Sequence, residues 1–165
     1  MENQTIRTYK LRRGRFTQAQ AAAIAEHAEL LLADGPVAFI EPYSHHSVRV
    51  LEIGFGMGEA TVATALREPE VGVIAADLHT PGIGKLISEL VLNEINSVRV
   101  VEADALELLY TRFPQDFLDG LRIFFPDPWP KARHHKRRLL TATNATELAK
   151  YVKAGGFLHL SLIHI

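Results

Sequence analysis

The chain has 165 residues, 47% of them hydrophobic and 22% charged, which suits one globular domain with a sizeable core. Its net charge is −1, and it contains no cysteine, which excludes disulfides, zinc–thiolate sites and a thiol nucleophile. No apolar run reaches the roughly 18–20 residues of a membrane span, and the basic N-terminus lacks the apolar core of a secretory signal. These features predict a cytoplasmic protein that does not enter a membrane.

The charges are strongly segregated along the chain. Windows 7–15 and 131–138 each hold five basic residues and no acid, whereas the remainder holds 8 basic and 19 acidic residues. The windows are either solvated surface or the contact face for a polyanion, and an acidic body with two basic patches favours the polyanion.

Elements alternate between helix and strand from residue 17 onward. We expect a basic arm over residues 1–16 and a single domain over 17–165. Thr17 and Gln20 have capping-box spacing and open a run of helix formers that should continue to the turn at 34–36. Strands are expected at 48–53, 71–77, 98–104, 121–125 and from 155, and helices at 60–68, 82–94, 105–112 and 137–153. This order predicts an α/β fold with a doubly wound, mostly parallel sheet that binds ligands at the carboxyl ends of its strands.

The first strand runs into a glycine-rich loop, "LEIGFGMG", at residues 51–58. Gly54, Gly56 and Gly58 would let the chain turn sharply and let a ligand approach the backbone. The nicotinamide fingerprint needs a glycine at position 59, which is Glu59, so the loop instead matches that of S-adenosylmethionine enzymes. The alternative is that these are turn glycines only.

Acidic residues stand at or near the ends of the three strands beside this loop. Asp77 ends the second strand and is placed to accept the ribose hydroxyls of a cofactor. Asp104, followed by Ala105, ends the third strand, where methyltransferases commonly contact the adenine. Glu52 lies inside the first strand, close to the methionine end. Asp77 and Asp104 have the alternative role of helix N-caps.

The stretch "FFPDPWPKARHHKRR", residues 124–138, follows the fourth strand. Pro126 and Pro128 restrict the backbone on both sides of Asp127, which predicts a carboxylate held in a stiff turn. Amino-group methyltransferases place a similar motif here, with a polar acceptor beside an aromatic. Trp129 either stacks on a splayed-out base or packs to close the turn. The adjacent histidines that follow predict no metal site.

Taken together, "PDPWPKARHHKRR", "LEIGFGMG", "LRRGRFTQAQ" and "DLHTPGIGKLI" resemble the bacterial tRNA (guanine-N7-)-methyltransferase family, over about residues 7–160. The resemblance implies a Rossmann-like class I methyltransferase fold, S-adenosyl-L-methionine as cofactor, and N7 of a variable-loop guanosine in tRNA as acceptor. It implies cofactor contacts for Glu52, Asp77, Asp104 and Asp127, with Asp127 also catalytic. Adding the basic patches, the residues expected to contact RNA are Lys131, Pro128, Trp129, Pro130, Ala132, Arg133, Lys136, Arg137, Arg12 and Arg13.

The chain departs from the family after "GGFLHL". The family continues with a Thr-Asp-Trp-like segment and the last strands, whereas here "SLIHI" follows and Ile163 stands where an aspartate is expected. We therefore expect a C-terminally truncated fold with its fifth strand at an open edge. Two alternatives remain: a methyltransferase of protein or small-molecule amino groups, and a non-catalytic RNA-binding fragment of the same fold.

Overall fold

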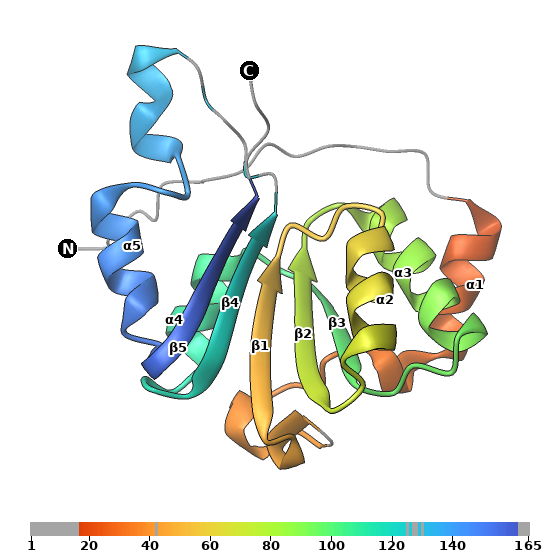
Figure 1. Cartoon of the computed structure of the whole chain (residues 1–165). Helices are drawn as coiled ribbons and strands as arrows, with labels where there is room; N and C mark the ends of the chain where they lie inside the picture. The colour runs from red at the N-terminus through yellow and green to blue at the C-terminus, as the bar shows by residue number, and fades with distance from the viewer. Residues whose placement is uncertain (1–16, 42, 125, 127–128, 130, 162–165) are drawn as a thin grey trace.

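A five-stranded parallel sheet forms the centre of the computed structural model, which describes residues 17–41, 43–124, 126, 129 and 131–161 (Figure 1). The strand order is β3-β2-β1-β4-β5, and every neighbouring pair is parallel. The strands are β1 (Val48–Ile53), β2 (Val71–Asp77), β3 (Val98–Glu102), β4 (Leu118–Phe124) and β5 (Val152–Ser161). The α-helices are α1 (Gln18–Glu26), α2 (Glu59–Arg67), α3 (Thr80–Leu92), α4 (Ala105–Arg112) and α5 (Ala142–Ala149). Short 3₁₀ helices are η1 (Ala28–Leu30), η2 (Val37–Phe39), η3 (Tyr43–His45) and η4 (Ala132–Arg137).

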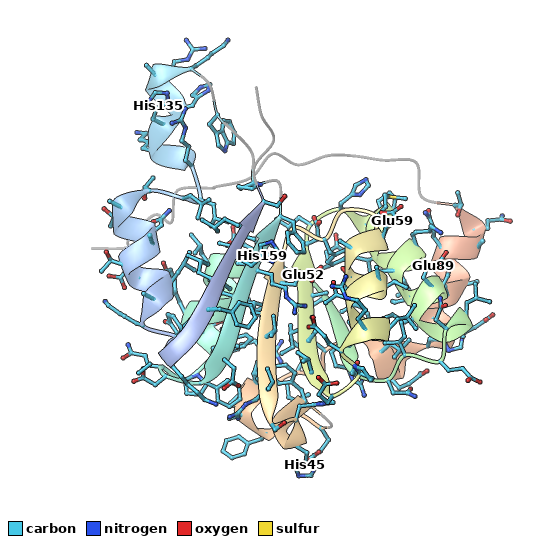
Figure 2. All side chains as sticks on the ribbon, in the orientation of Figure 1. His45, Glu52, Glu59, Glu89, His135 and His159 are labelled. Atoms are coloured by element: carbon cyan, nitrogen blue, oxygen red, sulfur yellow. The ribbon has the colours of Figure 1, made fainter. Side chains whose placement is uncertain are left out.

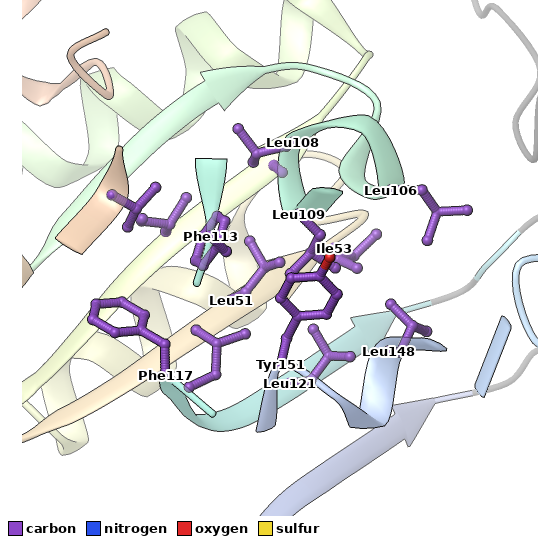
Figure 3. Packing of buried hydrophobic residues seen from close by; sticks show 14 of the residues in the cluster. Leu51, Ile53, Leu106, Leu108, Leu109, Phe113, Phe117, Leu121, Leu148 and Tyr151 are labelled. Atoms are coloured by element: carbon purple, nitrogen blue, oxygen red, sulfur yellow. The ribbon is translucent and has the colours of Figure 1, made fainter. Parts of the chain in front are cut away.

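Helices cover both faces of the sheet, so the expected doubly wound α/β fold is confirmed. Alternating side chains of β1 point to opposite faces. Leu51 and Ile53 pack with leucines of α4 and α5 in one core (Figure 3). Val50 packs with α2 and α3 in the other. The sheet is therefore buried on both faces at its centre.

Strand β1 lies between β2 and β4, where the direction of the strand order reverses. The connection after β1 leads to β2 on one side, and the chain later returns to β4 on the other side. Open α/β sheets bind their ligands at such a point, beyond the carboxyl ends of the strands. The glycine-rich loop and the chain after β4 therefore meet beyond the carboxyl ends of the central strands.

The helix expected to run from Thr17 to the turn at 34–36 ends earlier, at Glu26. Its capping box is present: the Thr17 hydroxyl accepts from the Gln20 amide, and the Thr17 amide donates to Gln20 Oε1. Beyond η1 the chain becomes extended at Leu31. This conformation lets Leu30 and Leu32 be buried. The Leu32 amide donates to Val100 O at 2.9 Å, so this segment covers the outer edge of β3.

The long helix expected over 137–153 is also wrong in extent. Thr141 caps α5 by accepting a hydrogen bond from the Asn144 amide, and α5 spans only Ala142–Ala149. Strand β5 already begins at Val152 and forms the edge of the sheet, with Phe157 and Leu158 exposed. In the part of the chain that the structure describes, no helix is long and apolar enough to cross a membrane.

Candidate functional site

Three glycines shape the loop between β1 and α2. Gly54, Gly56 and Gly58 have φ angles of +80°, +61° and +88°, a region that strongly favours glycine. A Cβ atom on Gly54 would lie 2.7 Å from the Phe124 carbonyl oxygen, and one on Gly58 would lie 2.9 Å from Leu86. On Gly56 it would meet nothing within 4 Å. The loop is thus packed tightly at its two ends, and beside the Cα of Gly56 it leaves open space.

Helix α3 closes on the middle of this loop from the other side. A Cβ atom on Gly82 would overlap the Gly56 carbonyl oxygen. Sequence reasoning missed Gly82, although a glycine in a helix is a signal because it costs about 0.5–1 kcal/mol relative to alanine. The close approach explains its presence and makes α3 the support of the loop.

Asp77 ties the same loop to the end of β2. Its Oδ2 accepts from the Gly56 amide at 2.8 Å, and its Oδ1 accepts from the Leu78 and His79 amides at 2.6 and 3.0 Å. A carboxylate offers about four acceptor positions, so three backbone donors leave about one for a ribose hydroxyl. The expected acceptance of both hydroxyls remains a prediction, and it requires Asp77 to release a backbone amide.

Glu52 is fully buried at the carboxyl end of β1, on the face that α2 covers (Figure 2). Its Oε1 accepts from the Thr61 hydroxyl of α2, whereas its Oε2 has no hydrogen-bond partner among the described residues. Burial raises the pKa of Glu52, and the Thr61 hydrogen bond and the Arg122 charge lower it in part. An unpartnered buried carboxylate oxygen is costly, which makes Glu52 a candidate to pair with a ligand. Its predicted cofactor contact stays a prediction.

Asp104 is the N-cap of α4, the alternative role that the sequence allowed for it. Its Oδ1 accepts from the Leu106 and Glu107 amides at 2.9 and 3.1 Å, and Ala105 is the first helical residue. Among the described residues no hydrogen bond reaches its Oδ2. Capping therefore leaves one oxygen of Asp104 for the predicted adenine contact, which stays a prediction.

The carboxyl end of β4 touches the glycine loop, because the Phe124 carbonyl abuts Gly54. The chain that carries the expected catalytic position therefore leaves the sheet next to the loop. Asp127 itself, with Pro128 and Pro130, lies outside the described residues. Its catalytic assignment stays a prediction.

The Trp129 side chain is buried and not exposed for stacking on a base. It is 6% exposed and its ring meets the His134 ring edge-to-face at 5.5 Å. Its φ of +40° is a strained conformation for a bulky residue. In this arrangement the indole packs under η4, so stacking on a base would require it to move out.

The basic segment Lys131–Arg137 stands beyond the carboxyl ends of β4 and β5, as the light-blue helix in Figure 1 shows. The side chains of Lys131, Ala132, Arg133, His135 and Lys136 are exposed. The side chain of Arg137 is not described, and Arg12 and Arg13 lie outside the described residues. This protruding cationic segment lies at the same end of the sheet as the glycine loop, beyond the carboxyl ends of the strands. No group of metal-ligand type gathers among the residues that the structure describes.

Comparison with known proteins agrees with this geometry. Residues 46–161 match the family described as "Putative methyltransferase". A tRNA (guanine-N(7)-)-methyltransferase of Thiobacillus denitrificans is 44% identical over 94% of this chain and 70% of its own length. Those of Nitrosospira multiformis and Neisseria meningitidis are each 41% identical, over 94% and 95% of this chain and 69% and 67% of theirs. The chain belongs to this methyltransferase family.

Solved methyltransferases share the fold at low sequence identity. Haemonchus contortus phosphoethanolamine N-methyltransferase 2, solved with S-adenosyl-L-methionine, superposes with a TM-score of 0.52 at 16% identity, over 85% of this chain and 27% of its own. Coclaurine N-methyltransferase, solved with N-methylheliamine and SAH, gives 0.51 at 16% identity, over 96% and 39%. The expected Rossmann-like methyltransferase fold is therefore confirmed.

Proposed function

We propose that the protein transfers a methyl group from S-adenosylmethionine to N7 of guanine in tRNA, at a variable-loop guanosine, in the cytoplasm. The observation that carries the proposal is the 44% identity to a tRNA (guanine-N(7)-)-methyltransferase across 94% of the chain. The glycine loop at the switch point of the sheet and the cationic segment on the same edge support it.

The described residues fit this cofactor at three points. Glu52 has a buried carboxylate oxygen that no described residue partners, which suits the ammonium of the methionine moiety, directly or through a water. Gly56 has open space where a side chain would otherwise stand, which lets a ligand approach its Cα closely. Asp77 and Asp104 each keep acceptor capacity, which suits ribose and adenine. When bound, the cofactor supplies an electrophilic methyl on a sulfonium.

Guanine N7 carries a lone pair and no proton, so its methylation needs no general base. The protein's task is then to hold the base in line with the methyl and to stabilise the positive charge that grows on the ring. We assign this task to Asp127, whose carboxylate accepts hydrogen bonds from the N1–H and N2–H₂ edge or offsets the ring charge. Its place three residues after β4 supports the assignment, since β4 ends against the loop.

The cations of Lys131, Arg133 and Lys136 are assigned to the tRNA backbone. They are exposed on a segment that extends away from the acidic body, and phosphate contacts position a nucleic acid without reading its sequence. The basic arm over residues 1–16 is assigned to the same task. Residues 17–165 then act as the catalytic domain.

Incubation with methyl-labelled cofactor and unmodified tRNA, followed by nucleoside analysis, tests the proposal. We expect label in 7-methylguanosine. Label in protein or small amines instead would identify an amino-group methyltransferase, and tRNA binding without label would identify a non-catalytic RNA-binding protein.

A further inference from the structure

Glu52 has a charged neighbour that the proposed mechanism does not yet use. Glu52 of β1 and Arg122 of β4 are register partners on adjacent parallel strands, so their side chains leave the same face of the sheet. Glu52 is 0% exposed and Arg122 is 6% exposed. Charged residues are rarely buried to this degree without a structural or functional partner.

Helix α2 ties both side chains in place. Thr61 and Glu68 are seven residues apart, which is about two helical turns and puts them on the same face of α2 or its C-terminal continuation. The Thr61 hydroxyl donates to Glu52 Oε1, and Glu68 Oε2 accepts from Arg122 Nη2 at 2.8 Å. Two strands and one helix thus hold a row of four polar side chains on the face of the sheet that α2 covers.

The row has one unused donor and one unused acceptor. Among the described residues, Glu52 Oε2 and Arg122 Nη1 are buried and have no hydrogen-bond partner. Glu68 is an acid, so with Glu52 ionised the row carries two negative charges against one positive charge. An additional cation beside Glu52 would balance it.

We propose that Arg122 is a positioning residue whose fixed charge keeps Glu52 ionised to receive the ammonium of the methionine moiety of the cofactor. The inference rests on the proposed function, because it takes S-adenosylmethionine as the ligand. Arg122 acts through Glu52 and does not itself touch the ligand. Burial pushes Glu52 toward its neutral form, and the fixed guanidinium opposes that push.

Other ionisable groups lie on the elements next to β1. They are Arg122 on β4, Glu59 and Glu68 on or next to α2, Asp77 at the end of β2, and His159 on β5, the register partner of Arg122. Arg122 is the register neighbour of Glu52 and the charge that lowers its pKa, so it is the group whose removal we expect to matter.

Calorimetric titration of the full chain with S-adenosylmethionine, from pH 5.5 to 8.5, tests the inference. Arg122→Met removes the charge and keeps much of the volume, and Arg122→Lys keeps the charge. Arg49→Met is the matched control, because Arg49 is also a largely buried arginine of the sheet but lies near the amino end of β1. Its guanidinium carbon stacks 4.2 Å from the centre of the Phe117 ring. Two buffers of different ionisation enthalpy report the protons released on binding.

We expect Arg122→Met to weaken binding by up to about tenfold at pH values where Glu52 is mostly protonated, since there one pKa unit changes its ionised fraction tenfold. The loss should shrink as pH rises, because Glu52 ionises in the variant as well, and binding should release more protons than in wild type. Arg122→Lys should restore most of the affinity, and Arg49→Met should leave the pH profile unchanged.

A loss that is equal at every pH, with unchanged proton release, would assign Arg122 a packing role and overturn the inference. If Arg122→Met does not fold, Arg122→Gln replaces it with the same expected pH profile. Wild-type protein that binds no cofactor at any pH would instead contradict the proposed function, and with it the role of Arg122.

Discussion

At the scale of single residues, the site places a carboxylate where folding disfavours its charge. Glu52 is buried, and one of its oxygens has no partner in the described structure. A residue that is costly to the fold and placed at the loop is best explained by a ligand that pairs with it. Stability and binding should therefore respond in opposite directions when its charge is removed.

Glu52→Gln should raise the melting temperature by a few degrees at pH 8 and weaken S-adenosylmethionine binding. The folded-state pKa of Glu52 is raised, so the folded protein binds more protons than the unfolded chain, and this carboxyl contributes less stability as pH rises. The gain should therefore shrink at pH 4–5. Thermal scans at both pH values check this, and a variant less stable than wild type at pH 8 would show that the charge stabilises the fold.

Asp77→Asn should lower the free energy of unfolding by about 1–3 kcal/mol even without cofactor, because a backbone amide loses its acceptor. The side-chain amide would face the Gly56 or Leu78 and His79 amides with its own donors. Urea unfolding of the cofactor-free variant measures the change. If its unfolding free energy equals that of wild type, Asp77 does not hold the loop in solution.

At the scale of elements, α3 and η4 serve the two halves of the site. Helix α3 supports the glycine loop through Gly82 and packs on α1, where Gln20 Nε2 donates to Pro81 O at 3.0 Å. Segment η4 extends basic side chains beyond the sheet. Each element can therefore be perturbed with a distinct expected result.

Gly82→Ala should abolish or strongly weaken cofactor binding, because its methyl group overlaps a backbone carbonyl that cannot move without the loop. Gly84→Ala is a control in the same helix. Its added methyl would lie 2.6 Å from Gln20 Cβ, so it should loosen α1 and leave the loop in place. Calorimetric titration of both variants compares them, and equal cofactor affinities would refute the supporting role of Gly82.

Arg133→Gln with Lys136→Gln should weaken tRNA binding and reduce the slope of log affinity against log salt by about 1–2, the contribution of two phosphate contacts. The control pair is Arg67→Gln with Lys150→Gln, which removes two exposed cations at the C-terminal ends of α2 and α5. Binding is measured across a salt series. An unchanged slope in the first pair would make η4 ordinary solvated surface.

The bounds of β1 and β2 were predicted from sequence because buried apolar runs end there at a glycine and an acid. The glycine loop after β1 and the acid at the end of β2 were predicted from these same patterns. The early end of α1 could not be predicted, since it depends on burial of Leu30 and Leu32 and on pairing with β3. Gly82 and Arg122 were missed for the same reason: their partners lie far along the chain, in contacts that only the fold creates.

At the scale of the whole molecule, a near-neutral chain divides into an acidic body and basic segments. The sheet brings the carboxyl ends of β1, β2, β3 and β4 to the same end of the molecule, and η4 extends from there. A polyanion held by η4 would thus reach the loop without lying on the acidic body. Under the proposed function, this arrangement joins the cofactor site to the tRNA contact.

Methyl transfer to N7 of guanine is the central claim, and substitution of that one atom tests it most directly. Two unmodified tRNA transcripts are compared, one made with guanosine and one with 7-deazaguanosine, whose ring has carbon at position 7. With methyl-labelled S-adenosylmethionine, we expect label in 7-methylguanosine from the first transcript and none from the second. Equal labelling of both transcripts, or no labelling of the first, would contradict the account.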